Sequence, residues 1–329
     1  MSGKPVLTGW RLRGLILSVI VAAAAYLGIA IWAGAEEVWH ALVQVGPFGL
    51  LLALSLSLVN YSLRFARWQL YLRALAHRIA APASLHIYLA GFALTTTPGK
   101  AGEALRGVLL KRRDVPYPDS FAAFVSERLS DLVAVVLLTL LGLTLVAHGE
   151  SLILAGVAAV AAGLLVLSQR RPLEALQRHA DRPGRRLWRG LHHAATILLQ
   201  ARRCHAPGLL AGATALSVVA WSAEALAFWW ILNAMGFEAG FAFAAFVFAL
   251  AMLAGALSFL PGGLGGTEAV MIGLLLLHDM PAADAVAATT LIRLTTLWFA
   301  VLLGLIALGS HPDARGDTAP ERRHDGGPA

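Results

Sequence analysis

Long apolar runs recur along most of this chain and set the first expectation about its structure. A helix rises 1.5 Å per residue, so about 20 apolar residues cross a hydrocarbon core about 30 Å thick. Such runs predict six full membrane crossings, at about 14–34, 47–63, 119–147, 151–168, 207–235 and 284–308. The pattern therefore predicts an all-α integral membrane protein.

Two further apolar regions are interrupted by breaks rich in Gly and Pro. The first runs from Ser84 to Leu110 and the second from Phe241 to Leu277. Their break residues are Pro98, Gly99 and Gly102, and Pro261, Gly262, Gly263, Gly265 and Gly266. A bilayer tolerates unpaired backbone groups at such breaks only where protein or a water-filled cavity surrounds them. Both regions are therefore predicted to be re-entrant helical hairpins.

The distribution of Lys and Arg supports this topology. The N-terminus, 64–78, 111–113, 170–203 and the C-terminal tail hold 22 of the 26 Lys and Arg residues. If these segments are cytoplasmic, the positive-inside rule is met, with both termini in the cytoplasm. We expect the membrane to be a bacterial inner membrane. The linker at about 170–206 is expected to carry an amphipathic helix on anionic lipid, or else a solvated basic loop. Residues 311–329 are expected to be a disordered cytoplasmic tail.

The two halves of the predicted membrane domain, 1–310, resemble each other at a nearly constant offset. Pro98 and Pro261 are 163 residues apart, and Arg64 and Glu224 are 160 apart. On the expected topology, the segments at about 47–147 and 207–308 form an inverted repeat. Such repeats are typical of transporters, in which discontinuous helices meet near the midplane at the substrate site. The shared Leu, Ala and Gly bias of membrane chains offers chance as an alternative.

Four basic residues, Lys100, Arg106, Arg128 and Arg293, fall inside the predicted membrane segments. Lys100 lies where the first returning half-helix starts, and the N-terminus of a helix attracts phosphate or carboxylate. The guanidinium groups of Arg128 and Arg293 suit bidentate binding of a phosphate. These residues predict a central anion site for a lipid headgroup phosphate. Arg106 is instead expected to snorkel to the cytoplasmic face.

Acidic residues accompany these cations. Glu103 and Glu268 lie in the first turns of the returning half-helices, and Glu127 and Asp131 flank Arg128. We expect them to gate the site or to pair with its cations, with helix-dipole stabilisation or local structural pairing as the alternative. A charged residue in a membrane segment costs about 2.5–3.5 kcal/mol on insertion scales, which favours function.

Arg64, Arg67 and Trp68 combine cations with an aromatic ring at the end of the second span. This combination is typical of residues that anchor a helix at the membrane interface.

Catalysis, metals and cofactors have no support in the sequence. The single cysteine, Cys204, cannot form an internal disulfide, and no Cys/His cluster has metal-ligand spacing. No P-loop or hydrolase motif is present. The formal net charge of +7 is explained by topology rather than by nucleic-acid binding. We therefore expect neither an enzyme nor a cofactor.

Three motifs together resemble the lysylphosphatidylglycerol synthase transmembrane family, also called flippase-like or UPF0104 proteins. They are Thr97-Pro98-Gly99-Lys100-Ala101-Gly102-Glu103, Ser126-Glu127-Arg128-Leu129-Ser130-Asp131, and Phe259-Leu260-Pro261-Gly262-Gly263-Leu264-Gly265-Gly266-Thr267-Glu268. The likeness covers about residues 10–310. In the bifunctional synthases, the membrane domain translocates aminoacylated phosphatidylglycerol and a separate soluble domain transfers the amino acid. The resemblance implies a stand-alone membrane domain without the transferase.

The expected function is to bind and translocate a polar lipid between leaflets. The lipid partner is an anionic or aminoacylated phospholipid, or another polar lipid. One alternative is an ion-coupled small-solute transporter, in which Glu268 or Asp131 would carry a proton. Another is a non-transporting accessory subunit of a lipid or polysaccharide pathway. The sequence leaves open whether a second copy or a pathway enzyme binds the chain.

Overall fold

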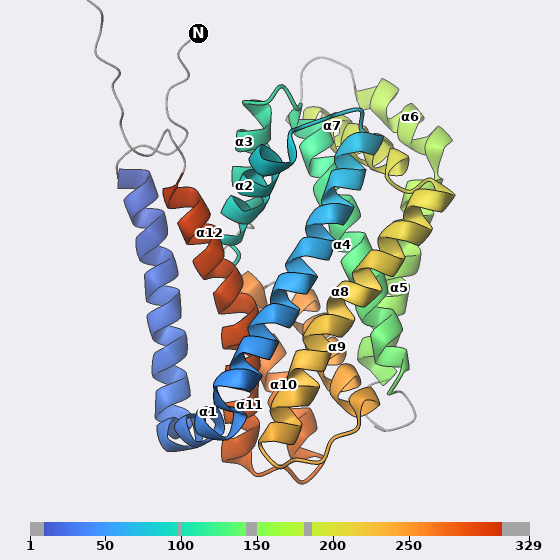
Figure 1. The fold of residues 1–329 in the computed structure, drawn as a ribbon. Helices are drawn as coiled ribbons and strands as arrows, with labels where there is room; N and C mark the ends of the chain where they lie inside the picture. Colours follow the sequence, from blue (N-terminus) through green and yellow to red (C-terminus); the bar gives the residue numbers. More distant parts are fainter. Residues whose placement is uncertain (1–9, 98–100, 143–149, 181–185, 259, 311–329) are drawn as a thin grey trace, which may run out of the picture.

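Helices make up most of the described structure (Figure 1). The computed structural model describes residues 10–97, 101–142, 150–180, 186–258 and 260–310, and no strand occurs in these ranges. The elements are α1 (Trp10–Ala74), α2 (Ala81–Phe92), α3 (Ala101–Lys111), α4 (Tyr117–Leu140), α5 (Glu150–Ser168), α6 (Arg170–Ala180), α7 (Arg186–Arg203), α8 (Pro207–Ala234), α9 (Phe241–Leu257), η2 (Pro261–Gly263), α10 (Gly266–Leu276), α11 (Ala282–Arg293), η3 (Leu294–Trp298) and α12 (Phe299–Gly309).

Several of these helices are long and apolar enough to cross a membrane. Among the described residues, Ala35–Ala74, Pro207–Ala234 and Ala282–Gly309 meet this condition alone. A fourth candidate is the pair Leu154–Leu167 and Arg170–His179, which is bent by 67°. The helical prediction is confirmed, and the protein is an all-α membrane protein. The number of six crossings stays a prediction. Helix α4 has the length of a span, but it carries three charged residues in its middle.

The helix α1 is not straight. Figure 1 shows it running down the edge of the bundle, turning at the lower end and rising again through the bundle. Gly46 has a φ of +66°, which a glycine adopts without steric cost, and Pro47 follows it. The predicted spans at 14–34 and 47–63 thus lie in two arms of α1. The second arm continues to Ala74, eleven residues beyond the predicted end.

The two interrupted regions form helical hairpins, α2–α3 and α9–α10. In Figure 1, α2 and α3 lie in the upper half of the bundle, and α9 and α10 lie in the lower half. The two breaks touch each other. A Cβ atom on Gly262 would lie 3.4 Å from Cγ2 of Thr96 and 3.6 Å from the carbonyl oxygen of Thr95. The hairpins therefore approach from opposite ends and meet inside the molecule.

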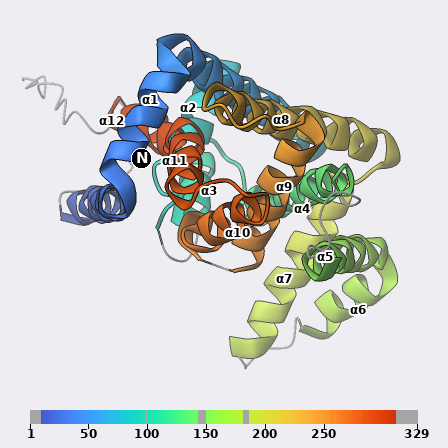
Figure 2. The same cartoon turned by 90° about the horizontal axis from the view of Figure 1, so that it is seen from below.

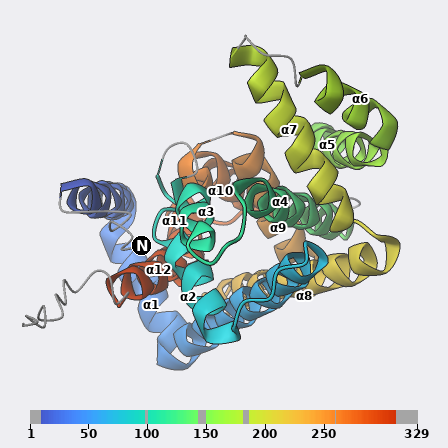
Figure 3. The same cartoon turned by 90° about the horizontal axis from the view of Figure 1, so that it is seen from above.

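The packing of the two halves is pairwise similar. The rising arm of α1 and helix α8 lie side by side, as Figures 2 and 3 show from both ends. Helix α1 packs on α11 as α8 packs on α4, and α2 packs on α12 as α9 packs on α4. This correspondence is the one expected for the predicted repeat, in which each half contributes one long helix, one hairpin and one following helix.

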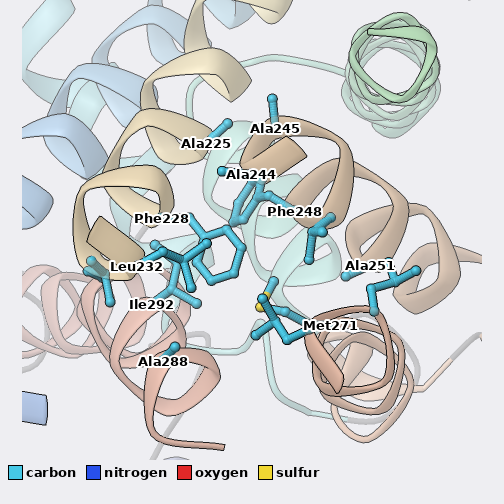
Figure 4. Packing of buried hydrophobic residues seen from close by; sticks show 14 of the residues in the cluster. Ala225, Phe228, Leu232, Ala244, Ala245, Phe248, Ala251, Met271, Ala288 and Ile292 are labelled. Atoms are coloured by element: carbon cyan, nitrogen blue, oxygen red, sulfur yellow. The ribbon is translucent and has the colours of Figure 1, made fainter. Parts of the chain in front are cut away.

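The larger apolar core joins the C-terminal helices (Figure 4). Phe228 of α8, Phe248 of α9, Met271 of α10 and Ile292 of α11 meet there. Alanines such as Ala244 lie between the large side chains. Small residues let membrane helices approach closely, and van der Waals packing then stabilises their association.

The linker between the halves is helical. Helices α6 and α7 pack on each other, and α7 also packs on α4 and α5. Figure 3 shows α5, α6 and α7 together at one side of the bundle. The Arg202 guanidinium donates a hydrogen bond to the carbonyl oxygen of Leu167, which ties the end of α7 to the end of α5.

Candidate functional site

Asp131 is the centre of a buried charge cluster, which we call the arginine cluster. Its carboxylate accepts hydrogen bonds from Nη1 of Arg67 at 2.7 Å and Nη2 of Arg64 at 3.3 Å, and lies 3.2 Å from Nη2 of Arg128. The indole N–H of Trp221 also donates to it, at 3.1 Å. The side chain of Arg67 is 0% exposed and that of Asp131 is 8% exposed. Three guanidinium groups thus surround one carboxylate.

Helical spacing creates this cluster. Arg64 and Arg67 are one turn apart on α1, and Arg128 and Asp131 are one turn apart on α4, so each pair shares a helix face. Helix α8 closes the cluster, because the hydroxyl of Ser217 accepts a hydrogen bond from Arg67. The cluster therefore joins helices from both halves of the chain.

The arginine cluster has more positive charge and more donors than Asp131 can satisfy. The Nε and Nη2 groups of Arg67 and the Nε of Arg64 are buried and have no acceptor in the described part of the protein. The guanidinium of Arg64 lies over the ring of Trp221, 5.3 Å from its centre, which compensates part of its burial. A buried donor without an acceptor costs about 1–3 kcal/mol, and more when charged. The cluster is therefore suited to a further anion.

A second ion pair holds the break of the α9–α10 hairpin. Nε of Arg293 donates to Oε1 of Glu268 at 2.7 Å, and its Nη2 donates to the carbonyl oxygen of Gly262 at 2.8 Å. Oε2 of Glu268 accepts the backbone N–H of Gly265 at 2.6 Å. Glu268 therefore caps α10, as its first-turn position predicts, and also neutralises Arg293. Gly262 and Gly265 have φ values of +62° and +85°, which explains glycine at both.

A third ion pair links the α2–α3 hairpin to α4. Nη2 of Arg106 lies 2.5 Å from Oε2 of Glu127, and the Glu127 side chain is 0% exposed. The Arg106 guanidinium lies 4.9 Å from the ring centres of both Trp68 and Tyr88. Two aromatic rings and one carboxylate thus engage the Arg106 guanidinium, as in a structural ion pair.

Glu224 on α8 differs from the other buried acids. The residue is 4% exposed, and its carboxylate makes no hydrogen bond or ion pair with any residue in the described ranges. It lies within electrostatic range of Arg64, Asp131 and Arg293. Glu224 therefore interacts electrostatically with both the arginine cluster and Arg293.

The predicted site residues are distributed over these ion pairs. The predicted contact of Arg128 with Asp131 is present, and Arg293 pairs with Glu268. Glu127 pairs with Arg106 rather than with Arg128. Lys100, Pro98 and Gly99 lie outside the described residues. Gly102 and Glu103 belong to α3, but the side chain of Glu103 lies outside the described part.

Two interpretations of basic residues are wrong. Arg106 does not snorkel to the surface, because the residue is only 9% exposed and its charge is paired inside the protein. Arg64, Arg67 and Trp68 do not anchor an interface, since Arg67 and Trp68 are 0% and 1% exposed. The second arm of α1 extends past 63, which carries these side chains into the bundle.

Sequence reasoning did not assign Arg64, Arg67 and Glu224 to the site. A signal for two of them was present, since Arg64 and Glu224 occupy matching places in the predicted repeat. Arg67 follows Arg64 by one turn and shares its face.

No group of three or more His, Cys, Asp or Glu side chains suited to a metal ion occurs among the residues that the structure describes.

The model of the family described as the lysylphosphatidylglycerol synthase TM region matches residues 15–304. The chain belongs to this family. A UPF0104 membrane protein of Methanothermobacter thermautotrophicus is 25% identical over 324 residues, covering 90% of this chain and 95% of that protein. A UPF0104 membrane protein of Pyrococcus horikoshii is 24% identical over 319 residues, covering 88% and 94%.

A shorter likeness connects this member of the synthase TM family to glycosyltransferase AglD of Haloferax volcanii. The two are 30% identical over 124 residues, which is 37% of this chain and 19% of that protein. The full-length matches are thus to membrane proteins of similar length.

Proposed function

We propose that this protein binds the phosphate of a polar membrane lipid in the arginine cluster and moves the lipid between leaflets. The observation that carries the proposal is the excess of buried guanidinium groups around Asp131. Arg64, Arg67 and Arg128 bring three positive charges to one carboxylate, and donors of Arg64 and Arg67 lack acceptors. A phosphate supplies negative charge and several acceptor oxygens.

The location of the cluster supports a lipid as the source of that phosphate. The arginines lie on α1 and α4 and face α8, all of which have the length of membrane spans. Buried cations in membrane segments are costly and by default indicate a substrate pathway. A lipid that moves between leaflets must carry its headgroup phosphate past this depth of the bilayer.

The cycle that we propose uses the two halves as an inverted repeat with alternating access. The unsatisfied N–H groups of Arg67 are enclosed in this structure. A phosphate would reach them when α1, α4 and α8 separate, and it would then share the guanidinium groups with Asp131. The Arg293–Glu268 pair, which holds the hairpin break, would act as the gate on the opposite side. Both termini would lie in the cytoplasm, in a bacterial inner membrane, and no aminoacyl transfer would be needed.

The test is a leaflet-accessibility assay with the purified full-length chain in liposomes. The probe is headgroup-labelled phosphatidylglycerol, whose outer-leaflet label is quenched chemically. We expect wild type to expose the protected inner-leaflet label faster than empty liposomes. Arg67→Gln is expected to lose this activity. The matched control, Arg170→Gln, removes an exposed arginine on α6 and is expected to retain it.

Folding is checked by size-exclusion chromatography and thermal unfolding of each variant. Equal activity of a folded Arg67→Gln variant and wild type would contradict the proposal. Wild type that behaves like empty liposomes with phosphatidylglycerol, phosphatidylethanolamine and lysylphosphatidylglycerol would also contradict it. Uptake of a soluble ion-coupled solute, or stable co-purification with a pathway enzyme, would favour the alternative functions.

A further inference from the structure

A pocket of about 370 Å³ lies next to the arginine cluster, between α4, α5 and α7. Its lining includes Leu129 and Leu132 of α4, Gly163 and Val166 of α5, and Leu198 of α7. All lining residues but one are apolar or small. The exception is Arg128.

Arg128 belongs to the pocket and to the arginine cluster at the same time. Its side chain is 43% exposed, in contrast to the enclosed side chains of Arg64 and Arg67. Its Nη2 lies 3.2 Å from Asp131, which also forms ion pairs with Arg64 and Arg67. Arg128 is therefore the accessible end of the cluster.

We propose that this pocket is a lateral entrance that holds one phospholipid molecule, with an acyl chain against the apolar lining and the phosphate on Arg128. Charge complementarity selects this occupant, because an apolar pocket with one cation at its edge fits an amphiphile that carries one anionic group. The surrounding helices support the same choice, since α5 presents exposed apolar side chains such as Leu154, Leu165 and Val166 to its environment.

A small residue shapes the pocket wall. A Cβ atom on Gly163 would lie 3.0 Å from Cδ1 of Leu129, so glycine keeps α5 close to α4 while leaving space beside it. Ala162, the preceding residue, also lines the pocket, whereas Ala161 does not. Both alanines are exposed. They are neighbours on one helix, about 100° apart around its axis, and provide a matched pair for a test.

The role in transport rests on the proposed function. A phosphate on Arg128 lies next to Asp131, so a small shift passes it to Arg64 and Arg67 as the helices separate. Binding in the pocket itself does not require translocation. The two proposals can therefore fail separately.

The experiment is photo-crosslinking in nanodiscs that contain phosphatidylglycerol with a diazirine on one acyl chain. Crosslinked peptides are mapped by mass spectrometry in wild type, Ala162→Trp and Ala161→Trp. We expect adducts on α4, α5 and α7 peptides in wild type and in Ala161→Trp, and their loss in Ala162→Trp. Adducts of equal yield in all three proteins would overturn the pocket assignment.

The headgroup contact is tested with diacylglycerol that carries the same diazirine chain, and with Arg128→Gln. We expect lower adduct yield in the pocket for diacylglycerol than for phosphatidylglycerol, and equal yields for the two lipids in Arg128→Gln. Equal yields already in wild type would overturn the assignment of Arg128.

Arg67→Gln separates the two proposals, because its adducts are expected to remain while its translocation is lost. If wild type forms pocket adducts but does not translocate lipid, the pocket remains a lipid site and the proposed function is contradicted.

Discussion

The side-chain amide of Asn60 donates a hydrogen bond to the carbonyl oxygen of Ala220 at 2.8 Å. These residues are 160 positions apart, which is the offset between Arg64 and Glu224. When a two-fold axis relates two antiparallel helices, equivalent residues of the two helices contact each other where the helices cross the axis. The bond therefore lies where α1 and α8 would cross the axis of the proposed inverted repeat. Arg64 and Glu224 lie one turn away from it on their helices.

The contact between α12 and the end of α2 depends on Gly304. A Cβ atom there would lie 2.1 Å from the backbone nitrogen of Ala93. Gly304→Ala is expected to destabilise the protein by about 1–3 kcal/mol, because backbone cannot move aside cheaply. Gly273→Ala, in α10, meets nothing within 4 Å and is expected to gain about 0.5–1 kcal/mol from helix propensity. Thermal unfolding in detergent compares them, and equal melting temperatures would contradict the packing.

Arg106 and Glu127 are expected to act as a structural pair. Arg106→Met leaves the Glu127 carboxylate buried without its partner, which costs about 3–5 kcal/mol. The double variant Arg106→Met/Glu127→Leu removes both charges and is expected to recover most of that loss. Thermal unfolding of the single and double variants measures the recovery. A double variant less stable than Arg106→Met would refute the assignment.

Glu268 has two interactions that can be separated. Glu268→Gln keeps an acceptor for the N–H of Gly265 but removes the charge that neutralises Arg293. Glu268→Ala removes both, and the lost cap alone costs about 1 kcal/mol. We expect lower translocation in both variants and a lower melting temperature in Glu268→Ala than in Glu268→Gln. Wild-type translocation by Glu268→Gln would exclude a role in gating.

Glu224 is expected to control release of the phosphate. Its carboxylate lies within electrostatic range of Arg64, so Glu224→Gln makes the arginine cluster more attractive to an anion. We expect stronger phospholipid retention and slower translocation than in wild type. The melting temperature is expected to equal or exceed that of wild type, since no hydrogen bond or ion pair is lost within the described ranges. A large fall in stability would contradict this account.

The helices and hairpins could be predicted because local sequence determines them. Apolar runs of span length set the positions of α5, α8 and α11–α12, and the Gly/Pro breaks set those of the hairpins. The end of α1 was harder to place. Arg64 and Arg67 are of a residue type that is typical of a membrane interface. Their burial depends on Asp131, which is 64 residues after Arg67.

The choice of partner within the site could not be read from sequence spacing. Arg128 has acidic neighbours on both sides, Glu127 and Asp131. Glu127 and Asp131 are four residues apart, so they share a face of α4 and lie about one turn apart along it. Even so, Glu127 pairs with Arg106 of the hairpin while Asp131 pairs with Arg67 of α1. Only the packing of α3 and α1 against α4 determines which acid meets which arginine.

Native mass spectrometry with defined lipids tests most directly whether the arginine cluster holds a lipid phosphate. The proteins compared are wild type, Arg67→Gln and Arg170→Gln. Each is released in the mass spectrometer from detergent that contains equal amounts of phosphatidylglycerol and diacylglycerol. We predict that wild type and Arg170→Gln retain phosphatidylglycerol in preference to diacylglycerol, and that this preference is smaller in folded Arg67→Gln, in which the contact of the phosphate with Arg128 in the pocket remains. Equal retention of both lipids by wild type, or an unchanged preference in Arg67→Gln, would contradict the proposed site.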